Sequence, residues 1–305
     1  MSKGYSLATT VDRKVEIESK RIEKLNQIKY TEGSVDEYNE YIEEIQNLHK
    51  NSNAKYSWKK ILNEIPPKSK IEKAQKEYEE FKPSFINKIF NNEDKKRNKL
   101  KEEVEKAKNK YNNYVKKLEI EQELARGVIE GNEVSMLKAI EKYGPLDDLL
   151  YYITDFNISI HSSELLEIVL NADIAGVVPN EIRSLTKSGK VSIKNMSNAK
   201  FNELTQDYIS SLNIRIALDI FALLPTVQEV QITTSTTKLN TSNGHYYEGI
   251  ILKVTIDRET LDSMNINGID PSDAIDITFK GKSKYTKSKG YSIISSNIEG
   301  EFVEG

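Results

Sequence analysis

A heptad stripe over residues 100–128 constrains the fold of this 305-residue chain more than any other feature. Its members recur at alternating spacings of four and three residues, and they are Leu100, Val104, Ala107, Tyr111, Tyr114, Leu118, Glu121, Ala125 and Val128. Such spacing predicts one continuous helix of about 43 Å. Each large apolar side chain gains roughly 1.5–3 kcal/mol on burial, so another helix is expected to cover the stripe.

The partner of this stripe is either an earlier helix of the same chain or a second copy of the chain. Residues 11–28 and 35–45 carry apolar positions at helical spacing, and Pro66-Pro67 breaks the pattern after them. Ala and Tyr in the stripe are untypical of a tight dimeric zipper. We therefore expect an antiparallel pairing within the chain, with residues 11–28, and keep self-association as the alternative.

The second half of the chain has a different texture, which begins near Gly131-Asn132. Short alternating runs predict strands, whereas residues 198–224 carry apolar positions over a broad helical face that ends at Pro225. The sequence thus predicts an α+β fold. A helical, coiled-coil-like layer is expected in residues 1–131, and residues 132–305 are expected to form a mixed domain with a central helix on a mostly antiparallel sheet.

Composition excludes several classes of function. The chain has no cysteine and only three histidines, far apart in sequence, so disulfides, thiolate metal sites and a cysteine nucleophile are excluded. No apolar run approaches 18 residues, and the first residues lack the apolar core of a signal peptide. We expect a cytoplasmic protein without a cofactor, a bound metal or a membrane span.

A lysine-rich segment near the C-terminus is the first candidate binding site. Lys280, Lys282, Lys284, Lys287 and Lys289 surround Tyr285 and precede Tyr291. Basic residues interleaved with aromatic ones can hold a phosphate backbone and stack bases. Lysines alternating with Ser and Tyr are also typical of an edge strand whose charges block edge-to-edge pairing, and this second interpretation is favoured.

A polar turn at residues 239–248 is the second candidate. It gathers Asn240, Asn243, His245 and Glu248, and His245 with Glu248 would form a general-base pair. Asn-rich turns also arise from backbone geometry alone. A nuclease would need Glu-x-Lys on the following strand to hold a metal, but the residue two before Lys253 is not Glu.

Two other motifs have a plain structural interpretation beside a functional one. LTKSGK at residues 185–190 suggests phosphate binding but lacks the spacing of a phosphate-binding loop, and a turn before a strand explains it equally well. The aspartates Asp257, Asp270, Asp273 and Asp276 would suit Mg²⁺, although Asp257 and Asp270 are also placed to cap helices.

Several stretches together resemble an uncharacterised bacterial protein family. They are LHK (48–50), Trp58 with Pro66-Pro67, FKPSFINKIFNNEDKKR (81–97), VVPNEIRSLTKSGKVSIKNM (177–196), QDYISSLNIRIALDIFALLP (206–225), LNTSNGH (239–245), DRETLDSMNINGIDPSDA (257–274) and KSKG (287–290). Members of that family often carry a small glycine-rich module at the N-terminus, which this sequence does not contain. The resemblance implies a shared fold and carries no activity or functional residue with it.

Two functions from different classes follow from these patterns. The first is a non-enzymatic interaction or scaffold protein, in which the helical half mediates assembly or self-association and the α+β half recognises a protein partner. The alternative is a protein that binds or processes nucleic acid through the lysine-rich segment. A processing enzyme of this kind could depend on a metal ion.

Overall fold

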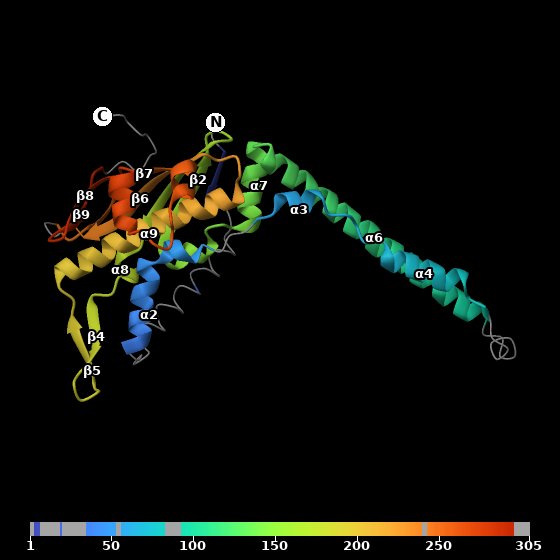
Figure 1. Cartoon of the computed structure of the whole chain (residues 1–305), viewed down its shortest axis with the longest axis horizontal. Coiled ribbons are helices and arrows are strands. Elements are labelled where there is room, and N and C mark those ends of the chain that lie inside the picture. Colours follow the sequence, from blue (N-terminus) through green and yellow to red (C-terminus); the bar gives the residue numbers. More distant parts are fainter. Residues whose placement is uncertain are drawn as a thin grey trace. The chain divides into compact units, whose positions relative to one another are not determined.

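The computed structural model describes residues 3–6, 19, 35–52, 56–82, 93–239 and 243–295. The chain forms two compact units (Figure 1). One, here called the helical unit, is Ser57–Ile129, and the other, the α+β unit, combines Met1–Tyr56 with Glu130–Gly305. The sequence predicted a single boundary at 131, whereas in the structure the N-terminal segment belongs with the C-terminal half.

The helical unit is an antiparallel hairpin of helices. Helices α3 (Trp58–Leu62) and α4 (Ser69–Glu79) pack along α6 (Glu93–Ile129). Near the end of α6, Gln122 Nε2 donates to the backbone carbonyls of Ile61, Leu62 and Glu64 at 3.3, 3.2 and 3.0 Å. Near its start, Lys96 Nζ lies 5.7 Å from the ring centroid of Phe81. The order of these contacts shows that the two arms run in opposite directions.

The predicted stripe forms the inner face of α6. Val104, Leu118, Ala125 and Val128 are buried, whereas Tyr114 is more exposed and donates its hydroxyl hydrogen to Glu64 Oε1. The α+β class and its antiparallel helical layer are therefore confirmed. Residues 58–79 lie along the stripe, because Pro66-Pro67 separates α3 from α4 without ending the helical layer. The predicted partner, residues 11–28, falls outside the described residues except for residue 19.

A seven-stranded sheet forms one layer of the α+β unit. Its strands, in spatial order, are β1 (Lys3–Ser6), β2 (Ile153–Ile160), β3 (Leu165–Ala172), β6 (Glu229–Leu239), β7 (Tyr246–Asp257), β8 (Lys282–Thr286) and β9 (Gly290–Ser292). Among the described strands of this sheet, only β3 and β6 pair in parallel, and every other pair of neighbours is antiparallel. The mostly antiparallel sheet predicted from the sequence is confirmed.

Helix α9 (Asn198–Leu223) is the central helix of this unit. Asn213 faces the sheet, because its Oδ1 accepts a hydrogen bond from Thr234 on β6 at 3.1 Å. Ser211 and Arg215, each about 200° round the helix from Asn213, contact the N-terminal segment instead. Layers on both sides explain why so few positions of α9 reach solvent.

The N-terminal segment supplies the third layer. Helix α2 (Val35–Gln46) and the short helix η2 (Leu48–Asn51) pack against α9, with Ile45 and Leu48 buried. Strand β1 also joins the sheet beside β2. The amphipathic spacing of residues 35–45 indicated a helix but could not show which unit it would cover.

Shorter elements complete the α+β unit. They are α7 (Glu133–Tyr143), η3 (Asp147–Tyr151), α8 (Ile174–Val177), α10 (Arg258–Ser263), α11 (Pro271–Asp273) and η4 (Ala274–Thr278). A separate two-stranded sheet consists of β4 (Glu181–Leu185) and β5 (Val191–Asn195), which pair only with each other among the described strands. This hairpin projects from the unit at the lower left of Figure 1, just before α9 begins.

Candidate functional site

The lysine-rich segment forms the β8–β9 hairpin at one end of the sheet. All five of its lysines are exposed, namely Lys280, Lys282, Lys284, Lys287 and Lys289. Lys282 lies directly opposite Lys253 of β7, so two like charges are neighbours across the strands. Lys287 Nζ is 3.6 Å from Glu203 Oε1 of α9. The segment is thus a basic hairpin at one end of the sheet, with its lysines before β8, on β8 and in the turn that is tied to α9.

The tyrosines of this hairpin do not share the exposure of the lysines. Tyr285 and Tyr291 are cross-strand partners whose ring centroids lie 5.1 Å apart at an interplanar angle of 58°. Tyr291 is buried, and that burial raises the pKa of its phenol above the ordinary value. Tyr285 is partly buried, and its hydroxyl oxygen is enclosed. The rings therefore pack inward, and no pair of open aromatic faces accompanies the lysines.

The polar turn between β6 and β7 does not assemble a catalytic pair. Asn240 lies outside the described residues, while Asn243, His245 and Glu248 are exposed. Asn243 Oδ1 accepts a hydrogen bond from the backbone N–H of His245 at 3.0 Å, which is a turn-stabilising contact. No hydrogen bond joins the side chains of His245 and Glu248 in the part of the turn that the structure describes.

Two of the four aspartates near the C-terminus, Asp257 and Asp270, have the predicted capping roles. Asp257 accepts from the Thr260 N–H at 2.8 Å, and Asp270 accepts from the N–H groups of Ser272 and Asp273 at 2.8 and 3.2 Å. Among the described residues, no three His, Asp or Glu side chains gather as a metal site would require.

A buried polar cluster that the sequence analysis missed joins α9 to the N-terminal segment. Arg215 Nε and Nη2 lie 2.6 Å from carboxylate oxygens of Asp219 and Asp148, respectively, and Ser52 Oγ donates to Asp219 at 2.6 Å. Burial raises the pKa of Asp219 to about 6 despite the adjacent guanidinium. The spacing of Arg215 and Asp219 by four residues in an apolar helix was the available signal.

His49 belongs to the same layer. Its backbone N–H donates to Ser211 Oγ at 3.0 Å, and its Nδ1 lies 2.8 Å from the same oxygen. Burial lowers the pKa of the imidazole to about 4, with the charge of Lys50 acting in the same direction. Because the ring is enclosed, these groups hold the layers together rather than form an open site.

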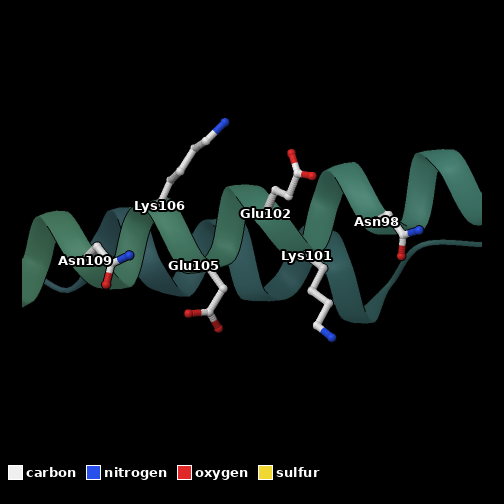
Figure 2. A pocket seen from close by; sticks show the side chains of 6 residues that line it. All are labelled: Asn98, Lys101, Glu102, Glu105, Lys106 and Asn109. Atoms are coloured by element: carbon white, nitrogen blue, oxygen red, sulfur yellow. The ribbon is translucent and has the colours of Figure 1, made fainter.

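A shallow hollow on α6 is lined by Asn98, Lys101, Glu102, Glu105, Lys106 and Asn109. Figure 2 shows that these side chains come from one helix and spread away from each other instead of pointing at a common centre. Two lysines balance two glutamates, so the hollow selects no charge. It is a solvated face of α6.

The β4–β5 hairpin is the strongest candidate for an interaction surface. The exposed fractions of Leu185, Val191 and Ile193 are 59%, 48% and 58%. Leu185 pairs with Val191, and Arg183 pairs with Ile193, so all four side chains lie on one face of the hairpin. Isolated apolar residues on a surface are common, whereas an exposed apolar face that three side chains share is a candidate interaction surface.

The base of this hairpin is bonded to helix α2, whereas its far end is a solvent-exposed turn. Tyr38 Oη of α2 donates to the backbone carbonyl of Glu181 at 2.7 Å. At the tip, the Thr186 N–H donates to the Lys190 carbonyl at 2.8 Å and Gly189 has φ +76°. The LTKSGK motif is therefore a hairpin turn, as its structural interpretation predicted, and the adjoining apolar face is what the sequence analysis missed.

Comparisons of the chain with protein-family models, with curated proteins and with solved structures find no match. The resemblance to an uncharacterised bacterial family is neither supported nor contradicted by them. Within the described residues, no helix is both long and apolar enough to cross a membrane.

Proposed function

We propose that this chain is a non-enzymatic interaction protein whose α+β unit recognises a protein partner through the β4–β5 hairpin. The observation that carries the proposal is the shared apolar face of Leu185, Val191 and Ile193. A lone two-stranded ribbon is at best marginally stable in water. Covering this face with a partner would bury apolar surface at about 25 cal/mol per Å² and order the ribbon at the same time.

The helical unit suits the assembly role in this proposal. Most of its stripe is already covered within the chain, but Ile65 and Ile120 are largely exposed. These two side chains offer apolar anchors on a surface that is otherwise strongly charged. A second copy or another helical protein would be bound there by a few central contacts rather than by a continuous zipper.

Site-specific crosslinking in the cells that make the protein tests the docking role of the hairpin. A photoreactive residue replaces Ile193 on the apolar face, and in a control protein it replaces Ile182, which lies on the opposite face of the same hairpin. We expect protein adducts of defined mass from position 193 and not from position 182. Equal adduct patterns at both positions would refute a dedicated docking face.

A second candidate function is nucleic-acid binding by the β8–β9 hairpin. The observation in its favour is the exposure of all five lysines beside Lys253. Binding of single- and double-stranded nucleic acid is measured from 50 to 200 mM salt, with Lys282→Glu/Lys284→Glu as the variant. Phosphate contacts by these two lysines would make the affinity fall with salt, and the variant would reduce that slope by about 2. Equal affinity and slope in both proteins would remove this candidate.

A further inference from the structure

We propose that the partner presents an extended segment of alternating apolar and acidic residues, which adds as a third strand to the outer edge of β5. This inference rests on the proposed function, because it names the chemistry of the partner at the same hairpin. Three features of the described residues support it: the backbone groups that β5 leaves open, the contact that occupies β4, and the charge of the hairpin.

The open edge of β5 follows from the hydrogen-bond alternation of the hairpin. Thr186 bonds with Lys190 and Asn180 bonds with Met196, each at 2.8 Å, so these are hydrogen-bonded pairs. Antiparallel pairs alternate between bonded and non-bonded. Val191 and Ile193 therefore fall in non-bonded pairs, and their N–H and C=O groups point away from β4. Within the described residues, these groups have no hydrogen-bond partner.

The other edge of the hairpin is partly occupied. The carbonyl of Glu181, which points outward from β4 by the same alternation, accepts the hydrogen bond from Tyr38 Oη of α2. Helix α2 also packs against β4. An added strand consequently has access to a longer edge on β5 than on β4.

The charge of the hairpin selects an acidic partner. Residues 181–195 contain Arg183, Lys187, Lys190 and Lys194 but only one acidic residue, Glu181, which already pairs with Arg183 at 2.8 Å. The hairpin thus carries a net charge of +3 on a chain whose net charge is −3. Two such hairpins would repel each other, which disfavours a second copy docking edge to edge through β5.

The two faces of β5 specify the order of residues in the added strand. Its residues beside Val191 and Ile193 continue the apolar face, whereas the intervening residues lie on the face of Ser192 and Lys194. Apolar side chains suit the first set, and carboxylates suit the second. The segment that matches is an alternation such as Val-Glu-Val-Glu, and its main chain would bond to Val191 and Ile193.

The test uses the full-length protein and a capped seven-residue peptide of alternating Glu and Val. Amide hydrogen exchange is followed residue by residue with and without the peptide. We expect the N–H groups of Val191 and Ile193, which are open in the free protein, to become protected. Those of Ser192 and Lys194 already point at β4 and should change little. Equal protection along β5, or none, would overturn strand addition.

Matched probes and variants separate the contributions. A peptide of alternating Lys and Val should bind at least about tenfold more weakly, because its positive charges would be repelled by the basic hairpin. Alternate N-methylation of the Glu-Val peptide, on the edge that bonds to β5, should abolish protection. Ile193→Thr should weaken binding about fivefold, whereas Ile182→Thr, on the other face, should not. An unchanged amide fingerprint outside 181–195 establishes that each variant is folded.

The remaining outcomes are equally decisive. If anionic vesicles of phosphatidylglycerol and phosphatidylcholine protect β5 while the peptide does not, the hairpin binds lipid and the inference is wrong. If the crosslinker at position 193 captures protein but the Glu-Val peptide gives no protection, the docking function stands and strand addition by an acidic segment fails. If neither occurs, both proposals fail.

Discussion

Replacing Arg215 by Met would remove the cation at the centre of the buried cluster between α9 and the N-terminal segment. The guanidinium and the Asp219 carboxylate are both buried and lie 2.6 Å apart. Removal of one partner from a buried ion pair leaves an uncompensated charge and costs roughly 3–5 kcal/mol. A domain of this size is typically stable by 5–15 kcal/mol, so the loss is a large fraction of the total.

The effect of this substitution should depend on pH through Asp219. The folded-state pKa of Asp219 is about 6, above its unfolded value of 3.8, so the native state favours the protonated acid. Without Arg215 that pKa rises further. At a pH above the folded-state pKa of Asp219 in both the original protein and the variant, the variant must bury an unpaired carboxylate. At a pH below both of these pKa values, the carboxylate is neutral in both proteins and most of the cost disappears.

The assay is urea unfolding at pH 8 and pH 5, followed by hydrogen exchange of α9 amides. We expect Arg215→Met to lower the free energy of unfolding by about 4 kcal/mol at pH 8 and by less than about half of that at pH 5. The double variant Arg215→Met/Asp219→Leu should recover most of the loss, because no charge is left buried. A loss below about 1 kcal/mol, or one that is equal at the two pH values, would refute this account.

Three further predictions concern the two units. Leu118→Asp places a carboxylate on the buried side of α6, so hydrogen-exchange protection should vanish over residues 97–128 and persist in α9; loss in both would show one cooperative unit. The fragment 132–305 lacks the cover that η2 gives α9 and should melt below the fragment 35–305 in calorimetry, with equal melting as the contrary result. The pKa of His49, about 4 when folded against 6.5 unfolded, means that its contribution to stability is lost as pH falls from about 6.5 to 4. His49→Gln should remove that loss. The melting temperature of the variant, measured over a pH series, should then show the gain in stability that Asp219 gives as the pH falls, and a pH profile equal to that of the original protein would contradict this prediction.

Periodicity explains which parts of this fold were predictable from the sequence. The stripe of α6 and the apolar face of α9 repeat over many turns, and Pro225 marks the end of the second helix. The alternating runs at β2, β3, β6 and β7 likewise indicated which face of each strand is buried. These are local patterns, and one element can be recognised from them without knowledge of its neighbours.

The unpredicted features depend on contacts that are distant in sequence. Strand β3 pairs in parallel with β6, although α8, the β4–β5 hairpin and α9 lie between them in the chain. Residues 35–51 show a helical pattern, but contacts with residues far away in sequence, such as Ser211 and Arg215 on α9, determine that this segment covers the α+β unit. Similarly, the alternation at Val191 and Ile193 indicated a strand, but not that its outer edge would have no neighbour among the described strands.

The β8–β9 and β4–β5 hairpins of the α+β unit differ in which side chains they expose, and this difference supports the docking role of the β4–β5 hairpin. Sheet edges that avoid association usually carry charges, and the β8–β9 hairpin presents exposed lysines on β8 and in its turn, beside the outer strand β9. Its aromatic side chains pack inward, where Tyr285 and Tyr291 contact each other. The β4–β5 hairpin does the reverse, since Leu185, Val191 and Ile193 share an open face beside an open edge. A chain that places charges on one hairpin and leaves another hairpin both apolar and accessible has a surface suited to a specific partner.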